Sequence, residues 1–153
     1  MTNATRLRIV NDMTQVAQAL SLIKSRKKRI TKARKSVIDT IYNYAKPVSA
    51  PEILEKLHKS GLKVNKTTIY RELNFLLGQN LVREVKISPY IIHYESANLG
   101  HHHHLICDNC GSVEEIVCDE LEAPMAVLQK RVSHNFSIKK HNLEFYGTCA
   151  GCV

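Results

Sequence analysis

Residues 101–110 read His-His-His-His-Leu-Ile-Cys-Asp-Asn-Cys, which places six metal-binding side chains in ten consecutive positions. Imidazole and thiolate groups are the preferred ligands of zinc and of neighbouring transition metals. Cys107 and Cys110 are separated by two residues, so both sulfurs can reach one ion. Cys149 and Cys152 repeat this spacing near the C-terminus. The two pairs together predict a closed tetrahedral site of four thiolates around a structural Zn²⁺.

Paired cysteines can also form a redox dithiol or a disulfide. Two pairs in one short C-terminal region, without a secretion signal, favour metal binding over these alternatives. The spacing argues against a simple zinc ribbon, which usually closes over about 15 to 20 residues. The ion would therefore hold together a whole subdomain. Cys118 stands outside both pairs, and we expect it to be a small buried residue rather than a ligand.

The composition indicates a folded protein without a membrane segment. The chain has 153 residues, enough for one or two small domains, and 44% of them are hydrophobic. No apolar run approaches the ~20 residues of a membrane span. The first residues include Arg6 and Arg8 without a following apolar core, unlike a signal peptide. We therefore expect a cytoplasmic protein with reduced thiols.

The charge is distributed unevenly along the chain. Residues 1–95 carry 18 Lys or Arg against 7 Asp or Glu, whereas residues 96–153 carry 4 against 7. All five cysteines and seven of the eight histidines lie from His93 onward. This division predicts a basic half that binds a polyanion, followed by a half that binds metal.

The apolar spacing of the first half predicts helices. Residues 4–28 form an amphipathic pattern with one stripe, made by Ile9, Val10, Met13, Val16, Leu20 and Ile23. Thr31 is the predicted N-cap of a second helix, with apolar positions up to Ala45, and Pro47 ends it.

Two further helices complete the pattern. Ser49-Ala-Pro-Glu52 is a capping box that begins the first of them, and Gly61 ends it. Asn65 or Thr67 caps the other, whose apolar face ends at Gly78. Short helices joined by a tight turn are typical of a helix-turn-helix.

The outer face of the last helix predicts DNA binding. Lys and Thr near its beginning can bind phosphates, Arg71 can donate to guanine O6 and N7, and Tyr70 can contact a thymine methyl group or a phosphate. A solvated face is the alternative, but such a face rarely exposes an aromatic beside an arginine. The basic run from Lys24 to Arg29 is either a solvated helix end or a phosphate or minor-groove contact, and we favour the contact. The predicted DNA-binding residues are Arg29, Lys66, Thr67, Thr68, Tyr70, Arg71 and Asn74.

A hairpin formed by Leu81–Lys86 and Tyr90–Tyr94 has the right size for a wing. Residues 1–95 therefore predict a winged helix-turn-helix domain with an N-terminal helical extension. The polar, glycine-ended segment 96–100 predicts a hinge, and residues 101–153 form the second domain.

The second domain is expected to be a small α/β domain, which makes the whole chain α+β. Strands are predicted at Leu105–Cys107, at Val113–Val117 and over Phe136–Tyr146, and a helix from Leu121 to Val132. So small a domain buries little surface by itself, so we expect both a metal ion and self-association to stabilise it.

Over roughly residues 29–152, the sequence resembles the ferric uptake regulator family of metal-responsive bacterial repressors. The resemblance rests on motifs in both halves: Thr68-Ile-Tyr-Arg71 with Leu73, His101–His104 followed by Leu-Ile-Cys-Asp-Asn-Cys-Gly, Glu115, His141, Tyr146-Gly147, and the pair Cys149 and Cys152. It implies a homodimer that represses transcription by binding double-stranded operator DNA when metal is bound.

The resemblance also implies three metal sites. The first is the structural zinc of the cysteine pairs. A regulatory site at the hinge would use Glu95, His102, His104 and Glu115. A further site in the dimerisation domain would use His101, His103, Glu122 and His141, although His103 stands where the family commonly has aspartate.

One position departs from the family pattern. Pro47 stands where the regulatory site usually receives a histidine from the DNA-binding domain. His93 could replace it, because residues two apart on a strand share a face and His93 would then point with Glu95. The alternative is that His93 is a surface histidine without a ligand role.

The regulatory metal is open among Fe²⁺, Mn²⁺ and Zn²⁺, because carboxylate and imidazole suit all three. We favour iron, because Glu95 stands where zinc-sensing relatives often place cysteine; the four-histidine run keeps zinc as the alternative. Peroxide sensing is disfavoured, since that subgroup favours aspartate at Glu115. An enzyme is not expected, since no His-Glu-x-x-His motif is present. A metal storage or delivery module would leave the recognition helix unexplained.

Overall fold

The computed structural model describes residues 3–44, 46–87, 90–117, 122–132, 135–138 and 141–153. The chain divides into two compact units, Met1–Leu99 and Gly100–Val153. Cys118 and Ala45, for which the sequence predicts burial and a helical position, lie outside the described residues. None of the described helices has the length and apolar character needed to span a membrane.

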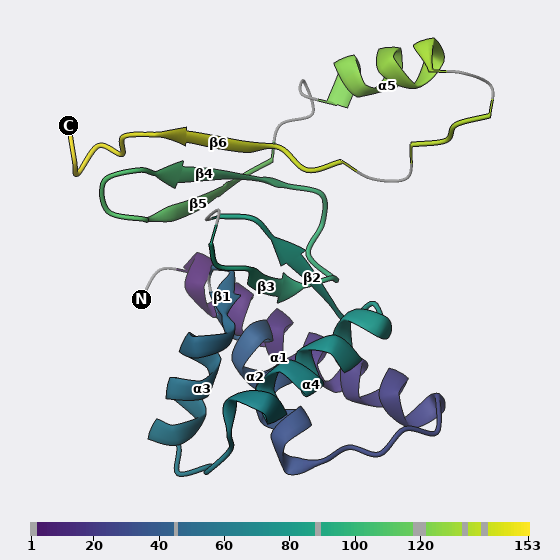
Figure 1. Ribbon diagram of the computed structural model, residues 1–153, viewed down its shortest axis with the longest axis vertical. Helices are drawn as coiled ribbons and strands as arrows, with labels where there is room; N and C mark the ends of the chain where they lie inside the picture. Colours follow the sequence, from purple (N-terminus) through teal and green to yellow (C-terminus); the bar gives the residue numbers. More distant parts are fainter. Residues whose placement is uncertain (1–2, 45, 88–89, 118–121, 133–134, 139–140) are drawn as a thin grey trace. The chain divides into compact units, whose positions relative to one another are not determined.

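The first unit combines helices with a small antiparallel sheet (Figure 1). Its described helices are α1 (Asn3–Ser25), α2 (Lys32–Tyr42), α3 (Ala50–Lys59) and α4 (Lys66–Gly78). Its described strands are β1 (Val48–Ser49), β2 (Val82–Val85) and β3 (His93–Ser96), in the order β1-β3-β2. This arrangement is the winged helix-turn-helix that the sequence predicts.

The helices begin where the capping residues predict. The side chain of Thr31 accepts from the Arg34 N–H, and that of Asn65 accepts from the Thr68 N–H. Ser49 and Glu52 form the complete capping box.

The end of one helix differs from the prediction. Gly61, with φ +82°, follows α3 as expected, but α2 ends at Tyr42, well before Pro47. Its C-cap is Asn43, which leaves the helical conformation (φ −97°, ψ 7°) and donates its side-chain amide to the Asp39 carbonyl. Helix α4 ends at Gly78, as the sequence predicts, and the left-handed residue that follows it is Asn80 (φ 54°).

The core of the first unit comes from one face of each helix. Ile23, Ile38, Ile53 and Ile69 are fully buried, one from each of α1 to α4. Val16, Ala19 and Leu20 of α1 also pack on this core, which confirms the second half of the predicted stripe. Burial of each such side chain contributes about 1.5–3 kcal/mol, so the helices are held mainly by packing.

The second strand of the wing has different bounds from those predicted. The second strand begins at His93 rather than Tyr90 and continues to Ser96. Strand β3 lies between two partners, with Tyr94 opposite both Val48 and Glu84. The strand extends only where these partners offer backbone hydrogen bonds, so Tyr90 precedes it and is 92% exposed.

The second unit is a three-stranded sheet with one described helix. Its elements are β4 (His103–Cys107), β5 (Val113–Ile116), α5 (Glu122–Arg131) and β6 (Glu144–Gly147). The strand order is β5-β4-β6, with β4 antiparallel to β5 and parallel to β6. The α+β class and the kinds of element agree with the sequence.

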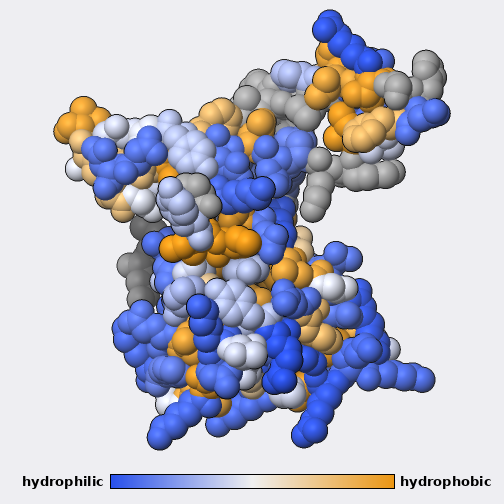
Figure 2. Space-filling model, viewed as in Figure 1, coloured by the Kyte–Doolittle hydropathy of each residue, from blue (hydrophilic) through white to orange (hydrophobic). Residues whose placement is uncertain are grey.

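Two details of the second unit differ from the sequence. Strand β6 is limited to Glu144–Gly147, and does not begin at Phe136. Gln129 of α5 donates to the Phe136 carbonyl and accepts from the Ile138 N–H, so this part of the chain bonds to a side chain instead of a strand. Leu128, an apolar residue of the predicted helix, is 44% exposed, and apolar side chains gather over α5 in Figure 2.

Replacing the capping serine tests how α3 is fixed. Ser49→Ala removes the acceptor for the Glu52 N–H and is expected to destabilise the first unit by about 1 kcal/mol, measured by urea unfolding. Ser21→Ala is the matched control: Ser21 is exposed within α1, where alanine favours the helix. An equal loss in both variants would contradict the role of the cap.

Candidate metal centres and nucleic-acid interface

The four paired cysteines come together at one end of the second unit's sheet. Cys107 is the last residue of β4 and lies opposite Gly147 of β6, two residues before Cys149. The Asp108 N–H donates to the Gly147 carbonyl at 2.8 Å, which holds the two chain segments together. The parallel pairing of β4 with β6 therefore explains how cysteines so far apart in sequence meet.

Tight turns then bring the second cysteine of each pair to the same place. The Gly111 N–H donates to the Cys107 carbonyl at 2.8 Å, with Gly111 in the left-handed region (φ 67°). The Cys152 N–H donates to the Cys149 carbonyl at 2.9 Å. The four sulfurs all lie within 4.8 Å of one another, and all four cysteines are free thiols.

The distances suit a tetrahedral zinc site. With Zn–S bonds of about 2.3 Å, the sulfurs of a regular tetrahedron lie about 3.8 Å apart. The sulfurs of Cys110 and Cys149 are 3.7 Å apart, whereas a disulfide requires about 2.05 Å. The donor set and its spacing fit a structural zinc, which these four residues would hold without an open coordination position.

The pKa values of these thiols reflect their crowding. Backbone N–H groups of Cys149 and Cys110 lower the pKa of Cys107 to about 6. Hydrogen bonds with the Cys149 and Cys110 sulfurs raise the pKa of Cys152 to about 12. Thiolates this close repel one another, so a divalent cation between them is needed for all four to ionise together.

A second cluster consists of His101, His103 and His141. Their ring nitrogens lie within 4.8 Å of one another, and the ring centroids of His101 and His141 are 4.7 Å apart. His103 is only 1% exposed. Three convergent imidazoles are a ligand set for zinc and other divalent transition metals. The side chain of Glu122, the fourth predicted ligand, lies outside the described part of the chain.

The predicted regulatory histidines are adjacent on the second unit. The ring centroids of His102 and His104 are 4.8 Å apart. His104 lies opposite Glu115 on β5 and opposite Glu144 on β6, so all three share one face of the sheet. Glu144 is a carboxylate that the sequence reasoning missed, because only the parallel pairing of β6 places it beside His104.

The remaining predicted ligands belong to the first unit. Glu95 lies on β3, and its carboxylate accepts a hydrogen bond from Arg83 on the neighbouring strand. His93 is near Glu52, whose pKa is lowered: burial alone would raise it, but hydrogen bonds with Ser49 and the charges of His93 and Lys46 outweigh burial.

Helix α4 presents the predicted DNA-binding residues on its exposed side. Lys66, Thr67, Tyr70, Arg71 and Asn74 are all exposed, as is Arg29 ahead of α2. The Lys66 ammonium lies 5.7 Å from the centre of the Tyr70 ring. Hydrophilic side chains cover much of the helical part of the first unit in Figure 2. The exposed side of α4 is therefore basic and polar along its length.

Two residues of α4 have other roles. The backbone N–H and hydroxyl of Thr68 both donate to the Asn65 carboxamide oxygen at 2.8 Å, so Thr68 helps to cap the helix. Glu72, the one acidic residue of α4, is 4% exposed and pairs with Arg34 of α2 at 2.7 Å. The sequence reasoning missed this pair; a carboxylate among the inward positions Ile69 and Leu73 was its only signal.

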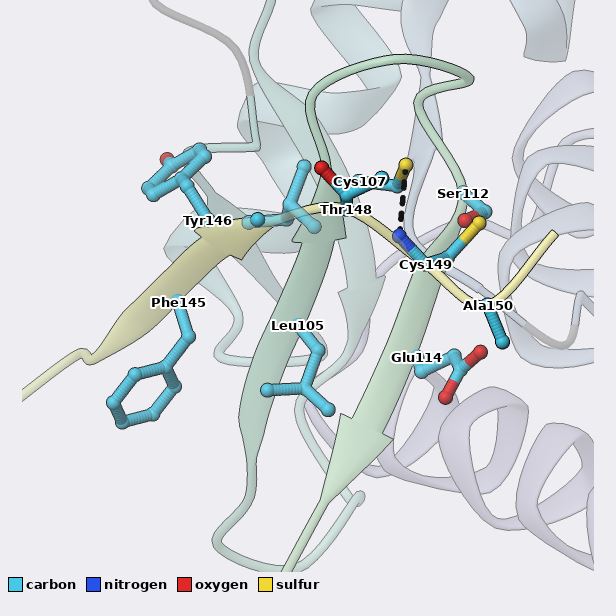
Figure 3. A pocket seen from close by; sticks show the side chains of 11 residues that line it. Leu105, Cys107, Ser112, Glu114, Phe145, Tyr146, Thr148, Cys149 and Ala150 are labelled. Carbon is cyan, nitrogen blue, oxygen red and sulfur yellow. Dashed lines mark hydrogen bonds between the residues drawn. The ribbon is translucent and has the colours of Figure 1, made fainter. Parts of the chain in front are cut away.

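A cavity of about 330 Å³ opens on the sheet beside the cysteine cluster (Figure 3). Glu114, Leu105 and Phe145 form one row across β5, β4 and β6. Leu105 is 37% exposed, Phe145 40% and Tyr146 54%. Leu105 and Phe145 thus leave apolar surface exposed on one face of the sheet, and Tyr146 does so on the other.

The sequence pattern of the ferric uptake regulator family matches residues 25–146, most of the chain. The chain belongs to the ferric uptake regulator family. A ferric uptake regulation protein of Campylobacter jejuni is 32% identical over 127 residues, which cover 81% of this chain and 79% of that protein. This chain is therefore a metal-dependent regulator.

Solved structures support the same fold. The Helicobacter pylori ferric uptake regulator has a TM-score of 0.76 at 24% identity, covering 92% of this chain and 93% of that one. A zinc uptake regulator complexed with zinc and DNA has a TM-score of 0.65 at 27% identity, covering 92% and 94%. Both iron and zinc regulators of the family thus share this architecture.

Removal of a single cysteine tests the structural zinc. Cys107→Ser, or the same change at Cys110, Cys149 or Cys152, is expected to release one zinc per chain and to unfold or monomerise the second unit, since structural zinc contributes on the order of 10 kcal/mol. Zinc content and thermal unfolding measure the effect, and prolonged treatment with a strong chelator should reproduce it. Cys118→Ser is the control, and equal zinc loss in this variant would contradict the assignment.

Proposed function

We propose that this protein is an iron-responsive transcriptional repressor that binds operator DNA as a homodimer. The observation that carries the proposal is the exposed side of α4, basic and free of carboxylate, on a winged helix joined to a metal-binding unit. A helix of this kind reads base edges in the major groove while its first residues contact phosphates. The partner is double-stranded DNA, as it is for the zinc uptake regulator complexed with zinc and DNA.

The second unit supports self-association. Leu105, Phe145 and Tyr146 leave apolar surface exposed on the sheet, and Val127 and Leu128 do so on α5. A soluble domain this small gains stability by covering such surface with a second copy. A two-fold dimer then carries two copies of α4, which suits an operator with two related half-sites.

Metal dependence is assigned to Glu95 together with His102, His104 and Glu115. Seven positions separate Glu95 from His102, so the chain allows them at most about 25 Å of separation. So short a connection gives a high effective concentration of one ligand near the others. A divalent ion held by both groups would link the two units, which lowers the orientational freedom lost on binding DNA.

The choice of iron depends on the ligand types. Glu95 supplies oxygen where zinc-sensing relatives often supply cysteine sulfur, and an oxygen and imidazole site suits Fe²⁺ or Mn²⁺. The His101, His103 and His141 cluster favours zinc as the alternative metal. A storage or delivery module would use the same clusters, but it gives no role to the exposed side of α4.

Metal specificity is tested by DNA binding at fixed salt with buffered free Fe²⁺, Mn²⁺, Zn²⁺ and Ni²⁺. The duplex is one selected from a randomised pool by the metal-loaded protein. For each metal, the free concentration that gives half-maximal DNA binding is compared with the free concentration of that metal in the cell. Iron or manganese should promote DNA binding within its cellular range, whereas zinc should require more than its cellular range. Activation by zinc alone would make the protein a zinc regulator, and failure of every metal to promote binding would favour storage.

The roles of Arg71 and Lys66 predict two different defects. Arg71→Ala should cost about 1–3 kcal/mol and relax specificity at one base position, because a bidentate contact to guanine is lost. Lys66→Ala should weaken binding to all sequences alike. It should also reduce the slope of log affinity against log salt concentration by about 1 for each protomer. Binding to a panel of single-base operator variants measures both. Unchanged discrimination in Arg71→Ala would mean that α4 docks differently.

The regulatory ligands are tested by single substitutions. His104→Gln should weaken the regulatory metal by about tenfold or more and leave the structural zinc in place. His93→Ala tests whether His93 replaces the histidine ligand that is missing at Pro47. A similar loss of metal affinity would add His93 to the ligands, whereas unchanged affinity would leave the site to Glu95, His102, His104 and Glu115. Metal titration and metal-dependent DNA binding are the measurements. Unchanged values for His104→Gln would overturn the site.

A further inference from the structure

The connection between α1 and α2 is fixed to α4 at two points. Arg26 donates through Nη1 to the Gln79 carbonyl at 2.7 Å and to the Gln79 side chain at 3.1 Å, just after the end of α4. Arg34 donates through Nη1 to the Arg29 carbonyl at 2.5 Å and through Nε to Glu72 at 2.7 Å. We call residues 26–31 the basic strap. Its backbone is thus tied to the helix predicted to read DNA.

Arg34 makes three contacts at once. Its guanidinium pairs with Glu72, holds the Arg29 carbonyl, and lies 3.4 Å from the centre of the Phe75 ring. The side chains of Arg34 and Glu72 are only 13% and 5% exposed. The planar, five-donor guanidinium can stack on a ring and donate in two directions at once, which a lysine ammonium cannot do with the same geometry. Arg34 therefore acts as a clamp between the strap and α4, and is not available to DNA.

Lys27 occupies a position that usually belongs to glycine. It has φ 55°, directly after the last turn of α1. The Lys28 N–H donates to the Ile23 carbonyl at 3.1 Å, the bond expected when a left-handed residue ends a helix. A lysine in this conformation costs more than glycine. The backbone conformation alone would favour glycine at this position, so the positive side chain of Lys27 is present despite its conformational cost.

The strap region carries uncompensated positive charge. From Met13 to Ile38 the sequence contains no acidic residue, while Lys24, Arg26, Lys27, Lys28, Arg29 and Lys32 are basic and exposed. Among the described ion pairs of the first unit, none involves these six side chains. A dense, fixed set of cations of this kind suits the phosphodiester backbone of nucleic acid.

We propose that the basic strap is a second DNA-contacting element, in which Lys27 and Lys28 bind backbone phosphates of the duplex that α4 reads. Arg34 and Glu72 are positioning residues that set the strap relative to α4, so that phosphate contacts and base contacts occur in one register. This inference rests on the proposed function, because it requires that the protein bind duplex DNA through α4.

The strap contact is tested with Lys27→Gly. Glycine suits φ 55°, so this variant should fold as well as the wild type while lacking one charge. Each lost phosphate contact should reduce the salt slope by about 0.9, and lower affinity about tenfold per protomer near 0.1 M salt. The assay uses the full-length metal-loaded protein and the duplex selected from a randomised pool. Lys59→Ser, which removes an equal charge from the Glu55 ion pair on α3, is the matched control and should leave the slope unchanged.

The clamp is tested with the double variant Arg34→Met with Glu72→Met. Replacing a buried ion pair by apolar side chains of similar volume is often tolerated, and thermal unfolding checks that the variant folds. The tie from Arg26 to Gln79 remains, so the strap is loosened, and Lys27→Gly should cost clearly less affinity than the roughly tenfold per protomer expected in the wild-type background. Such non-additivity is the sign of coupling between the clamp and the strap.

The outcomes distinguish a failure of the strap contact from a failure of the proposed DNA-binding function. If Lys27→Gly leaves affinity and salt slope unchanged while Arg71→Ala still weakens binding, the strap contact is wrong and the proposed function stands. If Lys27→Gly has the same effect in both backgrounds, Arg34 and Glu72 do not position the strap. If the metal-loaded wild type binds no duplex DNA, the proposed function itself fails.

Discussion

The parallel pairing of β4 with β6 is the constraint on which the second unit depends. It places Cys107 opposite Gly147, so that a turn after each strand brings Cys110, Cys149 and Cys152 to the same point. It also sets Glu144 beside His104, opposite Glu115. Parallel strands need a long connection, and here that connection contains β5 and α5. A metal ion at the cysteines would lock a pairing that so small a sheet could hardly maintain by itself.

The first unit uses one helix for two purposes. The inner side of α4 supplies Ile69 and Leu73 to the core, and its outer side carries Lys66 and Arg71. Glu72 of the same helix is buried and pairs with Arg34, which also donates to the Arg29 carbonyl in the strap. A buried ion pair adds little to stability but has strict geometry, which suits the positioning role that we propose for Arg34 and Glu72.

In the proposed function, a short piece of chain connects metal binding with DNA binding. Glu95 ends the wing side, and His102 begins the metal-binding side only a few residues later. An ion that binds ligands from both sides need not move the helices far; it has only to favour one population of arrangements. Because the coupling is reciprocal, DNA should in turn strengthen binding of the regulatory metal.

The sequence by itself determined the capping residues, the buried face of each helix in the first unit and which four cysteines form one cluster, because these depend on local spacing and on the chemistry of single side chains. The tertiary structure alone decided which strands pair, and hence where β3 begins, that β6 runs parallel to β4, and that Gln129 replaces a strand partner for Phe136 and Ile138. It also decided that Glu72 faces Arg34. Such pairings join residues far apart in the chain, and their free energy comes from surfaces that exist only after folding.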